Sequence, residues 1–393
     1  MTLSPPRSGA TPPPTDWLSE LGLSTGPARR QAPQPRRTRD FRRLEVGVLA
    51  LSALSSLAVV WVLFYQLTLL SGVLGFLVCW LVCFLVLYWV VTAQLVDRPA
   101  ATDRTVTVLV GTCAALVIGA LLYIVIWVAT KGIGHFNIGF LYHSMADYQP
   151  ADAHLTSVGV GHAIVGSFEE VGLAAFFGVP LAVATAVFLN EVGGVGTRFV
   201  RTVVTAMSGV PSIIAGVFIY ALFIIPHVLG YSGFAASLAL FVLLLPSVTR
   251  TTEEVLRVVP GGLREASLAL GASEWRTTRS VVLPTARSGL ITAVVLGVAI
   301  AAGETAPLIY TAFGNNDFNP DPFHGAQGAL PLVLWQNIQQ AQAVVVQLAF
   351  TAAFVLLSIV LILFVLARLL GRPSTRRGRL RGLVTAAMRL VGG

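Results

Sequence analysis

The chain has 393 residues, of which 11% are charged and 55% hydrophobic, and its mean hydropathy is +0.79. Soluble domains carry about 25% charged residues, so these values exclude a water-soluble enzyme and a largely disordered chain, and they indicate a chain surrounded mostly by lipid. The net charge of +8 therefore raises the question of membrane orientation, and no nucleic-acid partner is expected.

The first part of the chain is predicted to be a tail followed by two membrane helices. Residues 1–43 are rich in Pro, Ser and Arg without an early apolar core, so we expect a disordered basic cytoplasmic tail, not a cleavable signal. Residues 46–96 carry no charged side chain. A helix needs about 20 apolar residues to cross a bilayer, so this stretch accommodates two. Residues 44–98 are thus predicted to form two transmembrane helices additional to the main membrane domain.

The main membrane domain is predicted over residues 105–371, with six further helices. The apolar stretches that predict them are residues 105–130, 162–190, 202–249 (long enough for two helices), 288–313 and 344–367. Isolated strands would leave backbone groups unpaired in lipid, so helices are expected. The fold class predicted is an all-α polytopic membrane protein with about eight transmembrane helices.

The basic residues predict the orientation of these helices. With the N-terminus in the cytoplasm, 25 of the 26 Lys and Arg residues fall in cytoplasmic segments, and Lys131 alone falls outside. The positive-inside rule rejects the opposite orientation. Both termini are therefore predicted to be cytoplasmic, and residues 372–393 are interpreted as a second basic tail.

The cytoplasmic loop of residues 251–287 breaks into two short helical pieces. Residues 260–262 open the first piece, Gly271 suits its end, Ser273 can cap the second, and Pro284 is expected to end it. The first piece has an apolar side made of Leu263, Leu268 and Leu270. Such a helix can fill a groove on a partner protein or lie on the bilayer surface, and the residues alone leave both possibilities open.

Within this loop, a set of spaced residues resembles the EAA loop of ABC importer permeases. The family pattern is Glu-Ala-Ala, three residues, Gly, nine residues, Ile, one residue and Leu-Pro; here Ser267 and Val281 are the two departures. In that family the loop forms the coupling helix that docks onto the ATPase subunit. The resemblance implies a charged contact at Glu265 and close approach at Ala266 and Gly271. The residues it assigns to the coupling loop are Glu265, Ala266, Ser267, Gly271, Leu283 and Pro284.

Three further segments resemble phosphate-importer permeases of the PstA type, over about residues 105–371. They are Pro-Ser-Ile-Ile-Ala-Gly at 211–216, Arg-Thr-Thr-Glu-Glu at 250–254 and Gly-Glu-Thr-Ala-Pro-Leu at 303–308. This resemblance implies a six-helix core of the type I ABC importer (MetI-like) permease fold, transport of inorganic phosphate and a bacterial cytoplasmic membrane location.

The resemblance also implies partners, and it contains one departure. The implied partners are a second permease of the PstC type, two ATPase subunits of the PstB type and an external phosphate-binding protein of the PstS type, together with the lipid bilayer. No cofactor is implied. Members often carry an Arg about three residues before the Gly-Glu-Thr-Ala-Pro-Leu segment, whereas Ile300, Ala301 and Ala302 stand there in this chain. A basic contact to phosphate is therefore absent from this helix.

Charged residues within the apolar stretches are the other functional candidates. Glu304 lies in the seventh predicted helix, where a carboxylate is costly unless it faces a bundle interior or a water-filled path, and Pro307 can loosen that helix. For Glu304, a role in the transport pathway or its gate is favoured over a structural hydrogen bond to a neighbouring helix. The assigned pathway residues are Arg250, Glu253, Gly303, Glu304, Thr305 and Pro307.

Two other charged sites have simpler interpretations. Glu169 and Glu170 are adjacent, about 100° apart on a helix, so they cannot share a face, and a structural or interfacial role is favoured. The spacing of Arg250 and Glu253 allows an ion pair. A membrane anchor and a cytoplasmic exit site, where Arg250 would bind phosphate, both stay open at this position.

The sequence also limits the chemistry. There is no Gly-x4-Gly-Lys-Ser/Thr phosphate loop, and the three cysteines and six histidines lack ligand spacing, so neither ATPase activity nor a metal site is predicted. A non-catalytic permease subunit is expected. The alternatives are a permease for another oxyanion such as sulfate or molybdate, a membrane assembly protein that does not transport, and an ion-coupled secondary carrier, which leaves the EAA-like loop unexplained.

Overall fold

The computed structural model describes residues 38–67, 72–146, 148 and 158–371. The predicted tails lie outside these residues, except that the first helix begins at Thr38, inside the segment 1–43 expected to be a tail. The chain divides into two compact units, Met1–Ala120 and Leu121–Gly393. Among the described residues the regular structure is helical, and the one isolated bridge joins Phe313 to Gln327.

The first unit contains a pair of packed helices. They are α2 (Thr38–Val62), which continues into a π turn (Leu63–Leu67), and α3 (Val73–Leu95). The indole nitrogen of Trp80 donates to the carbonyl of Ala53 at 3.2 Å, and the rings of Phe64 and Phe76 meet edge to face at 5.6 Å. α4 (Arg98–Ile133) follows, and Asp97 caps its start by accepting from the Ala100 amide at 2.8 Å. Two long helices, α2 and α3, thus lie in this unit, and their assignment as an addition to a main membrane domain stays a prediction.

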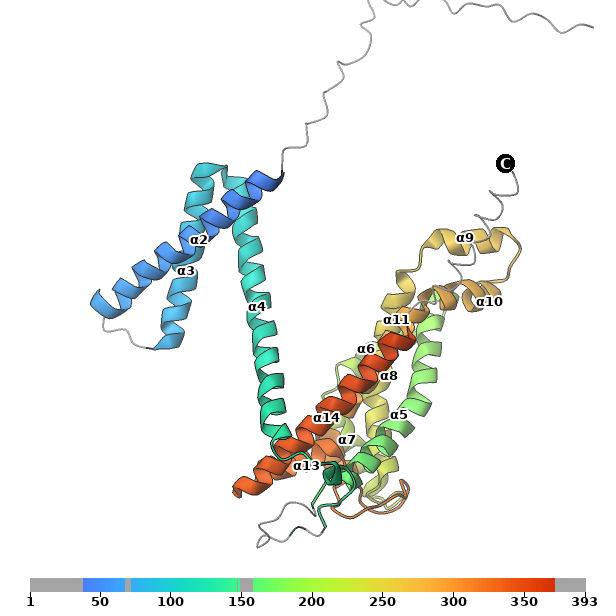
Figure 1. The fold of residues 1–393 in the computed structure, drawn as a ribbon. Coiled ribbons are helices and arrows are strands. Elements are labelled where there is room, and N and C mark those ends of the chain that lie inside the picture. Colours follow the sequence, from blue (N-terminus) through green and yellow to red (C-terminus); the bar gives the residue numbers. More distant parts are fainter. Residues whose placement is uncertain (1–37, 68–71, 147, 149–157, 372–393) are drawn as a thin grey trace, which may run out of the picture. The chain divides into compact units, whose positions relative to one another are not determined.

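The second unit is a bundle of helices of unequal length (Figure 1). In chain order they are α5 (Gly161–Val187) with a π turn (Phe188–Val192), α6 (Thr197–Ser208), α7 (Ser212–Ile219) with a π turn (Tyr220–Ile224), α8 (Gly233–Arg257), α9 (Gly261–Ala269), α10 (Glu274–Thr277) with a π turn (Thr278–Val282), α11 (Leu283–Ala302), α12 (Ala306–Thr311), α13 (Leu330–Ile338) and α14 (Ala343–Leu370). A short 3-10 helix (Ile138–Leu141) precedes α5.

The centre of this unit is the packing of α5 against α8. Small residues allow the two backbones to come close: a Cβ atom on Gly178 would lie 2.9 Å from the Leu244 side chain, and Ala182 is fully buried. The hydroxyl of Thr249 on α8 donates to the Ala182 carbonyl on α5 at 3.3 Å. Small residues at helix contacts are characteristic of membrane bundles, where dispersion contacts and hydrogen bonds replace the hydrophobic effect.

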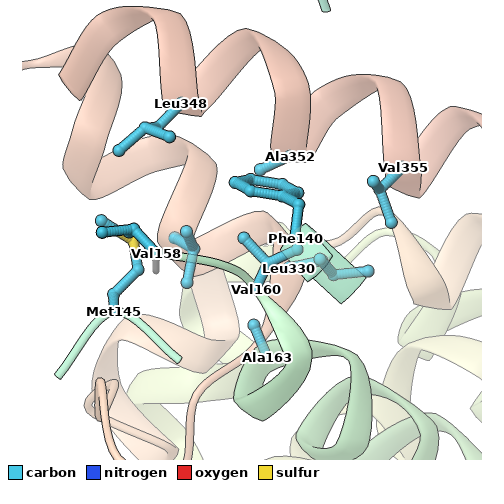
Figure 2. Close-up of a cluster of buried hydrophobic side chains, with 10 residues drawn as sticks. Phe140, Met145, Val158, Val160, Ala163, Leu330, Leu348, Ala352 and Val355 are labelled. Carbon is cyan, nitrogen blue, oxygen red and sulfur yellow. The ribbon is translucent and has the colours of Figure 1, made fainter. Parts of the chain in front are cut away.

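A second apolar cluster anchors the segment before α5. Figure 2 shows Phe140, Val160 and Ala163 lying against Leu330 of α13 and Ala352 of α14. The backbone supports this arrangement, because the Val160 amide donates to the Phe140 carbonyl at 2.8 Å. Phe140 and Val160, among the described residues between α4 and α5, are thus held against α13 and α14.

The number of spans agrees with the prediction, but their shapes differ. Among the described residues, seven helices are long and apolar enough to cross a membrane, or eight when one bent pair counts as a span. That pair is Thr197–Ser208 and Ser212–Ile224, bent by 101°, where one span beginning at residue 202 was expected. The break falls at Gly209 and Pro211, because proline lacks an amide proton and disfavours helix in the residue before it.

Candidate functional site

The predicted coupling loop forms two short helices at one end of the bundle (Figure 1). α9 begins after Pro260, and its C-terminal end turns at Gly271, whose φ of +83° favours glycine over residues with a Cβ. The Gly271 amide donates to the Leu268 carbonyl at 2.9 Å. The Ser273 side chain accepts from the Arg276 amide at the start of α10. These local predictions are confirmed.

The predicted end of the second piece is wrong. Pro284 occupies the first turn of α11, and the helical span runs without interruption from Glu274 to Ala302. The π turn Thr278–Val282 directly precedes α11, so the regular hydrogen-bond pattern is already altered next to Pro284, and the span continues through this proline.

The coupling-loop residues divide into an exposed set and an inward set. Glu265 and Ala266 are exposed on α9. Ser267 is half-buried and its hydroxyl lies 2.8 Å from the Thr277 hydroxyl, so it joins α9 to the following turn. Leu283 packs inward against the apolar cluster at this end of the bundle.

The coupling loop, on which Glu265 and Ala266 are exposed, also carries an exposed apolar surface. Leu263, Leu268, Leu270 and Trp275 are all exposed, and Leu270 is 90% exposed. Full burial of one such leucine is worth about 1.5–3 kcal/mol. This end of the bundle therefore presents a surface that a partner can bury.

Arg264 is a residue of this loop that sequence reasoning missed. Its Nε and Nη2 atoms donate to the two carboxylate oxygens of Glu191 at 3.0 and 2.7 Å, and it also donates to the carbonyls of Val259 (2.8 Å) and Leu256 (3.0 Å). The Glu191 side chain is only 6% exposed. Its hydrogen bond with Arg264 raises the pKa of the guanidinium, which stays charged. One feature of the sequence could have pointed to this contact: Glu191 is a carboxylate that directly follows the predicted span of residues 162–190.

Glu253 does not form the ion pair with Arg250 that was expected. Glu253 Oε1 accepts from Arg201 at 2.8 Å and from Arg257 at 2.6 Å, whereas Arg250 is exposed. Arg257 lies one helical turn after Glu253, and Arg201 reaches it from α6. Glu253 therefore joins α6 to α8.

An open groove of about 590 Å³ lies beside this network, between α8, α11 and α14. Thr251 and Glu254 line it, while Arg250 and Glu253 do not. The two residues assigned to an exit site are thus not brought together in this hollow.

The Gly-Glu-Thr-Ala-Pro-Leu segment forms a break between two helices, where one continuous span was expected. α11 ends at Ala302, the Glu304 amide donates to the Ala301 carbonyl at 3.2 Å, and α12 starts with Pro307 in its first turn. Gly303 is exposed, Glu304 and Thr305 are half-buried, and Pro307 is buried. Among the described residues the Glu304 carboxylate has no hydrogen bond or ion pair. Glycine at the end of one helix and proline at the start of the next explain the break.

A polar network holds the N-terminal part of α5, around Ser167 and Glu169. The Gln327 side-chain amide donates to the Glu169 carboxylate and, at 3.1 Å, to the Asn319 carbonyl. The Ser167 hydroxyl accepts from the Leu330 amide at 2.9 Å. Glu170 is buried on a different side of α5, in agreement with the prediction that the two glutamates do not share a face.

The family described as binding-protein-dependent transport system inner membrane component matches residues 178–373. Phosphate transport system permease protein PstA 1 of Mycobacterium tuberculosis is 38% identical over 223 residues, which cover 56% of this chain and 72% of the relative. PstA of Mycobacterium leprae is 41% identical, with coverage of 50% and 64%, and PstA of Xylella fastidiosa is 37% identical, with coverage of 54% and 74%.

Among solved structures, a chain of the inward-facing MetNI methionine ABC transporter aligns with a TM-score of 0.42 and 23% identity, covering 55% of this chain and 93% of the other. The relatives confirm the resemblance carried by the sequence segments, and the helical spans confirm a multi-pass membrane protein. The chain belongs to the PstA family of phosphate transport system permease proteins.

Proposed function

We propose that the chain is the transmembrane permease subunit of an ATP-driven importer for inorganic phosphate, in which it forms half of the translocation path. The observation that carries this proposal is the coupling loop: α9 and α10 stand at one end of the bundle with Glu265, Ala266 and an exposed apolar surface available to a partner. The names of the relatives supply the substrate class.

The coupling loop is assigned to an ATPase of the PstB type. Leu268, Leu270 and Trp275 enter a groove on that subunit, Glu265 supplies a charged contact, and the turn at Gly271 keeps the backbone close to it. The permease itself is non-catalytic, and the ATPase supplies hydrolysis. A second permease of the PstC type and an external binding protein of the PstS type complete the importer. Closure and opening of the ATPases drive alternating access between two permease halves.

The helix break at Gly303–Thr305 is assigned to the translocation path. A break leaves backbone groups without intrahelical partners, and within a membrane such groups are tolerated only where protein or a water-filled path surrounds them. Glu304 stands at this break without a polar partner among the described residues. A carboxylate repels phosphate when ionised, so Glu304 acts as a gate residue and not as the phosphate ligand.

The charge distribution supports an orientation with both termini in the cytoplasm, within a bacterial cytoplasmic membrane. α9, α10 and the Glu191 end of α5 then face the cytoplasm, and the loop that precedes α13 faces outward. This agrees with an ATPase that docks from the inside and a binding protein that docks from the outside.

Substrate competition tests the proposal. The chain is reconstituted with its paired permease, ATPase and binding protein into proteoliposomes that contain ATP, and uptake of labelled inorganic phosphate is measured. Unlabelled phosphate should suppress uptake, whereas sulfate and molybdate at the same concentration should not. Absence of labelled phosphate uptake, together with ATP-dependent uptake of labelled sulfate or molybdate, would assign the permease to another oxyanion.

A further inference from the structure

The contact between Arg264 and Glu191 joins elements whose positions matter for coupling. Arg264 lies on α9, Glu191 lies in the π turn that ends α5, and the guanidinium also binds carbonyls at the end of α8. An arginine fork that engages both carboxylate oxygens fixes direction as well as distance. Because the Glu191 side chain is little exposed, loss of this partner would leave an uncompensated charge. A displacement of α9 is therefore resisted by the end of α5.

The helix that receives this contact is held along its length. α5 continues from Gly161 to Val187 across Pro180, and the π turn follows without a gap. Its middle packs closely on α8 through Gly178 and the bond between Thr249 and Ala182. Packed contacts of this kind favour movement of α5 as one element over local deformation.

The far end of α5 is tied to the opposite side of the bundle. Ser167 accepts from the Leu330 amide at the start of α13, and Glu169 accepts from Gln327 in the loop before it. A Cβ atom on Gly166 would overlap the Gly328 carbonyl, so the helix and the loop are in direct backbone contact. α5 thus connects the coupling loop to the segment around Gln327 through specific contacts at both ends.

We propose that Arg264 and Glu191 are positioning residues that transmit displacement of the coupling loop to α5, and through α5 to the loop at the opposite end of the bundle. This inference rests on the proposed function, because it assigns the path by which ATPase movement reaches the far side. It predicts that weakening the ion pair separates ATP hydrolysis from phosphate movement while the ATPase stays bound.

Two conservative variants test the pair in the full importer reconstituted in proteoliposomes. Arg264→Lys keeps the charge but removes the two-point fork, and Glu191→Gln keeps an acceptor oxygen but removes the charge. Each should lower phosphate uptake per ATP hydrolysed by about tenfold, within the usual range of coupling between sites. Co-purification of the ATPase and its basal hydrolysis should stay at the wild-type level. In the double variant, phosphate uptake per ATP should fall no further than in the more impaired single variant, because each substitution removes the same interaction.

Arg198→Gln is the matched control, because Arg198 is an exposed basic residue close to Glu191 in the chain. It should leave uptake per ATP unchanged. Wild-type uptake per ATP in both single variants, or losses that multiply in the double variant, would overturn the inference while leaving the proposed function intact. Absence of ATP-driven phosphate uptake by the wild-type importer would instead overturn the proposed function, and the inference with it.

A measurement on the wild-type importer does not depend on how the variants fold. Amide hydrogen exchange is compared between the nucleotide-free complex and the complex trapped with vanadate. Exchange in Phe188–Val192 and in the loop around Gln327 should change together with exchange in α9. A change confined to α9, with both ends of α5 unaltered, would contradict transmission through this helix.

Discussion

Gly216 of α7 lies directly against Pro307 of α12: a Cβ atom on the glycine would stand 2.5 Å from the proline Cα. The two residues belong to the Pro-Ser-Ile-Ile-Ala-Gly and Gly-Glu-Thr-Ala-Pro-Leu segments, which are about 90 positions apart in the chain. Their contact places the helix break that carries Glu304 beside the helix that follows the bend at Gly209–Pro211. Two of the three segments that resemble PstA-type permeases therefore pack against each other.

Gly216→Ala should destabilise the protein by about 1–3 kcal/mol, because the atoms in conflict with the new methyl group are backbone atoms of Pro307 and the helices must move apart. The midpoint of thermal unfolding of the purified protein in detergent measures this loss. Gly172→Ala is the control, since a Cβ atom there meets no atom within 4 Å. Equal stability of the two variants would contradict the close packing of α7 on α12.

Leu270→Ala should weaken binding of the ATPase subunit, because the 90% exposed side chain becomes buried in the proposed complex. Losing that burial costs about 1.5–3 kcal/mol, which is roughly a tenfold to hundredfold change in affinity. Titration of the ATPase onto the permease in nanodiscs measures the effect. Val195→Ala removes a similar apolar group from a fully exposed position outside the coupling loop and should bind normally. Normal binding by Leu270→Ala would remove this leucine from the interface.

Glu265→Lys should abolish coupled uptake, because it reverses the charge of an exposed contact on α9. The expected readouts are loss of co-purified ATPase and loss of phosphate uptake, with unchanged insertion of the permease into the membrane. Asp103→Lys makes the same change of charge sign on α4, at an exposed residue that is not part of the coupling loop, and serves as the control. Retention of a bound and coupled ATPase by Glu265→Lys would show that the assignment of this interface is wrong.

Glu304→Gln tests the gate assignment. The amide has nearly the size of the carboxylate, so the change removes charge and leaves the packing around Pro307 in place. Phosphate uptake should fall by at least about tenfold, equivalent to about 1.4 kcal/mol, while ATPase binding persists. Wild-type uptake by this variant would count against a gate at the α11–α12 break.

The loop before α13 should respond to acid through Asp321. The Phe323 amide and His324 bind the Asp321 carboxylate and hold its pKa below the usual value. Because the folded pKa is the lower one, the stabilising contribution is present at neutral pH and is lost as pH falls through that lower value, below about pH 4. Protection of the Phe323 amide, which is the intrinsic exchange rate at each pH divided by the observed rate, should be present at pH 5 and be lost in more acidic solution. Asp321→Asn should remove the acid step, and its persistence in that variant would exclude Asp321 as the cause.

The local features of this protein could be predicted from its sequence because they depend on neighbouring residues. Hydropathy located the spans, and the cap at Ser273 and the left-handed turn at Gly271 follow from side-chain and backbone preferences within a few positions. The bend at Gly209–Pro211 had the same kind of local signal, but the prediction rested on the length of the apolar stretch 202–249 and did not include a bend there. Pro284 was misread because proline usually ends a helix, whereas here it follows a π turn that already alters the hydrogen-bond pattern.

The contacts that join distant elements could not be predicted in this way. Arg264 and Glu191 are 73 positions apart, and no spacing rule pairs them. Arg201 reaches Glu253 only because α6 lies beside α8, which is a consequence of the bundle and not of either segment. The Gln327 contact with Glu169 likewise depends on how the loop folds over α5. Tertiary packing decides such pairs.

The source of energy is the most direct test of the central claim that this permease works with an ATPase. Proteoliposomes containing the complete importer are loaded with ATP, the proton gradient is collapsed with an uncoupler, and uptake of labelled inorganic phosphate is followed. The account predicts that uptake continues at the rate seen without uncoupler and stops when internal ATP is replaced by ADP. Uptake that stops with the uncoupler while ATP is present would contradict it and favour an ion-coupled carrier.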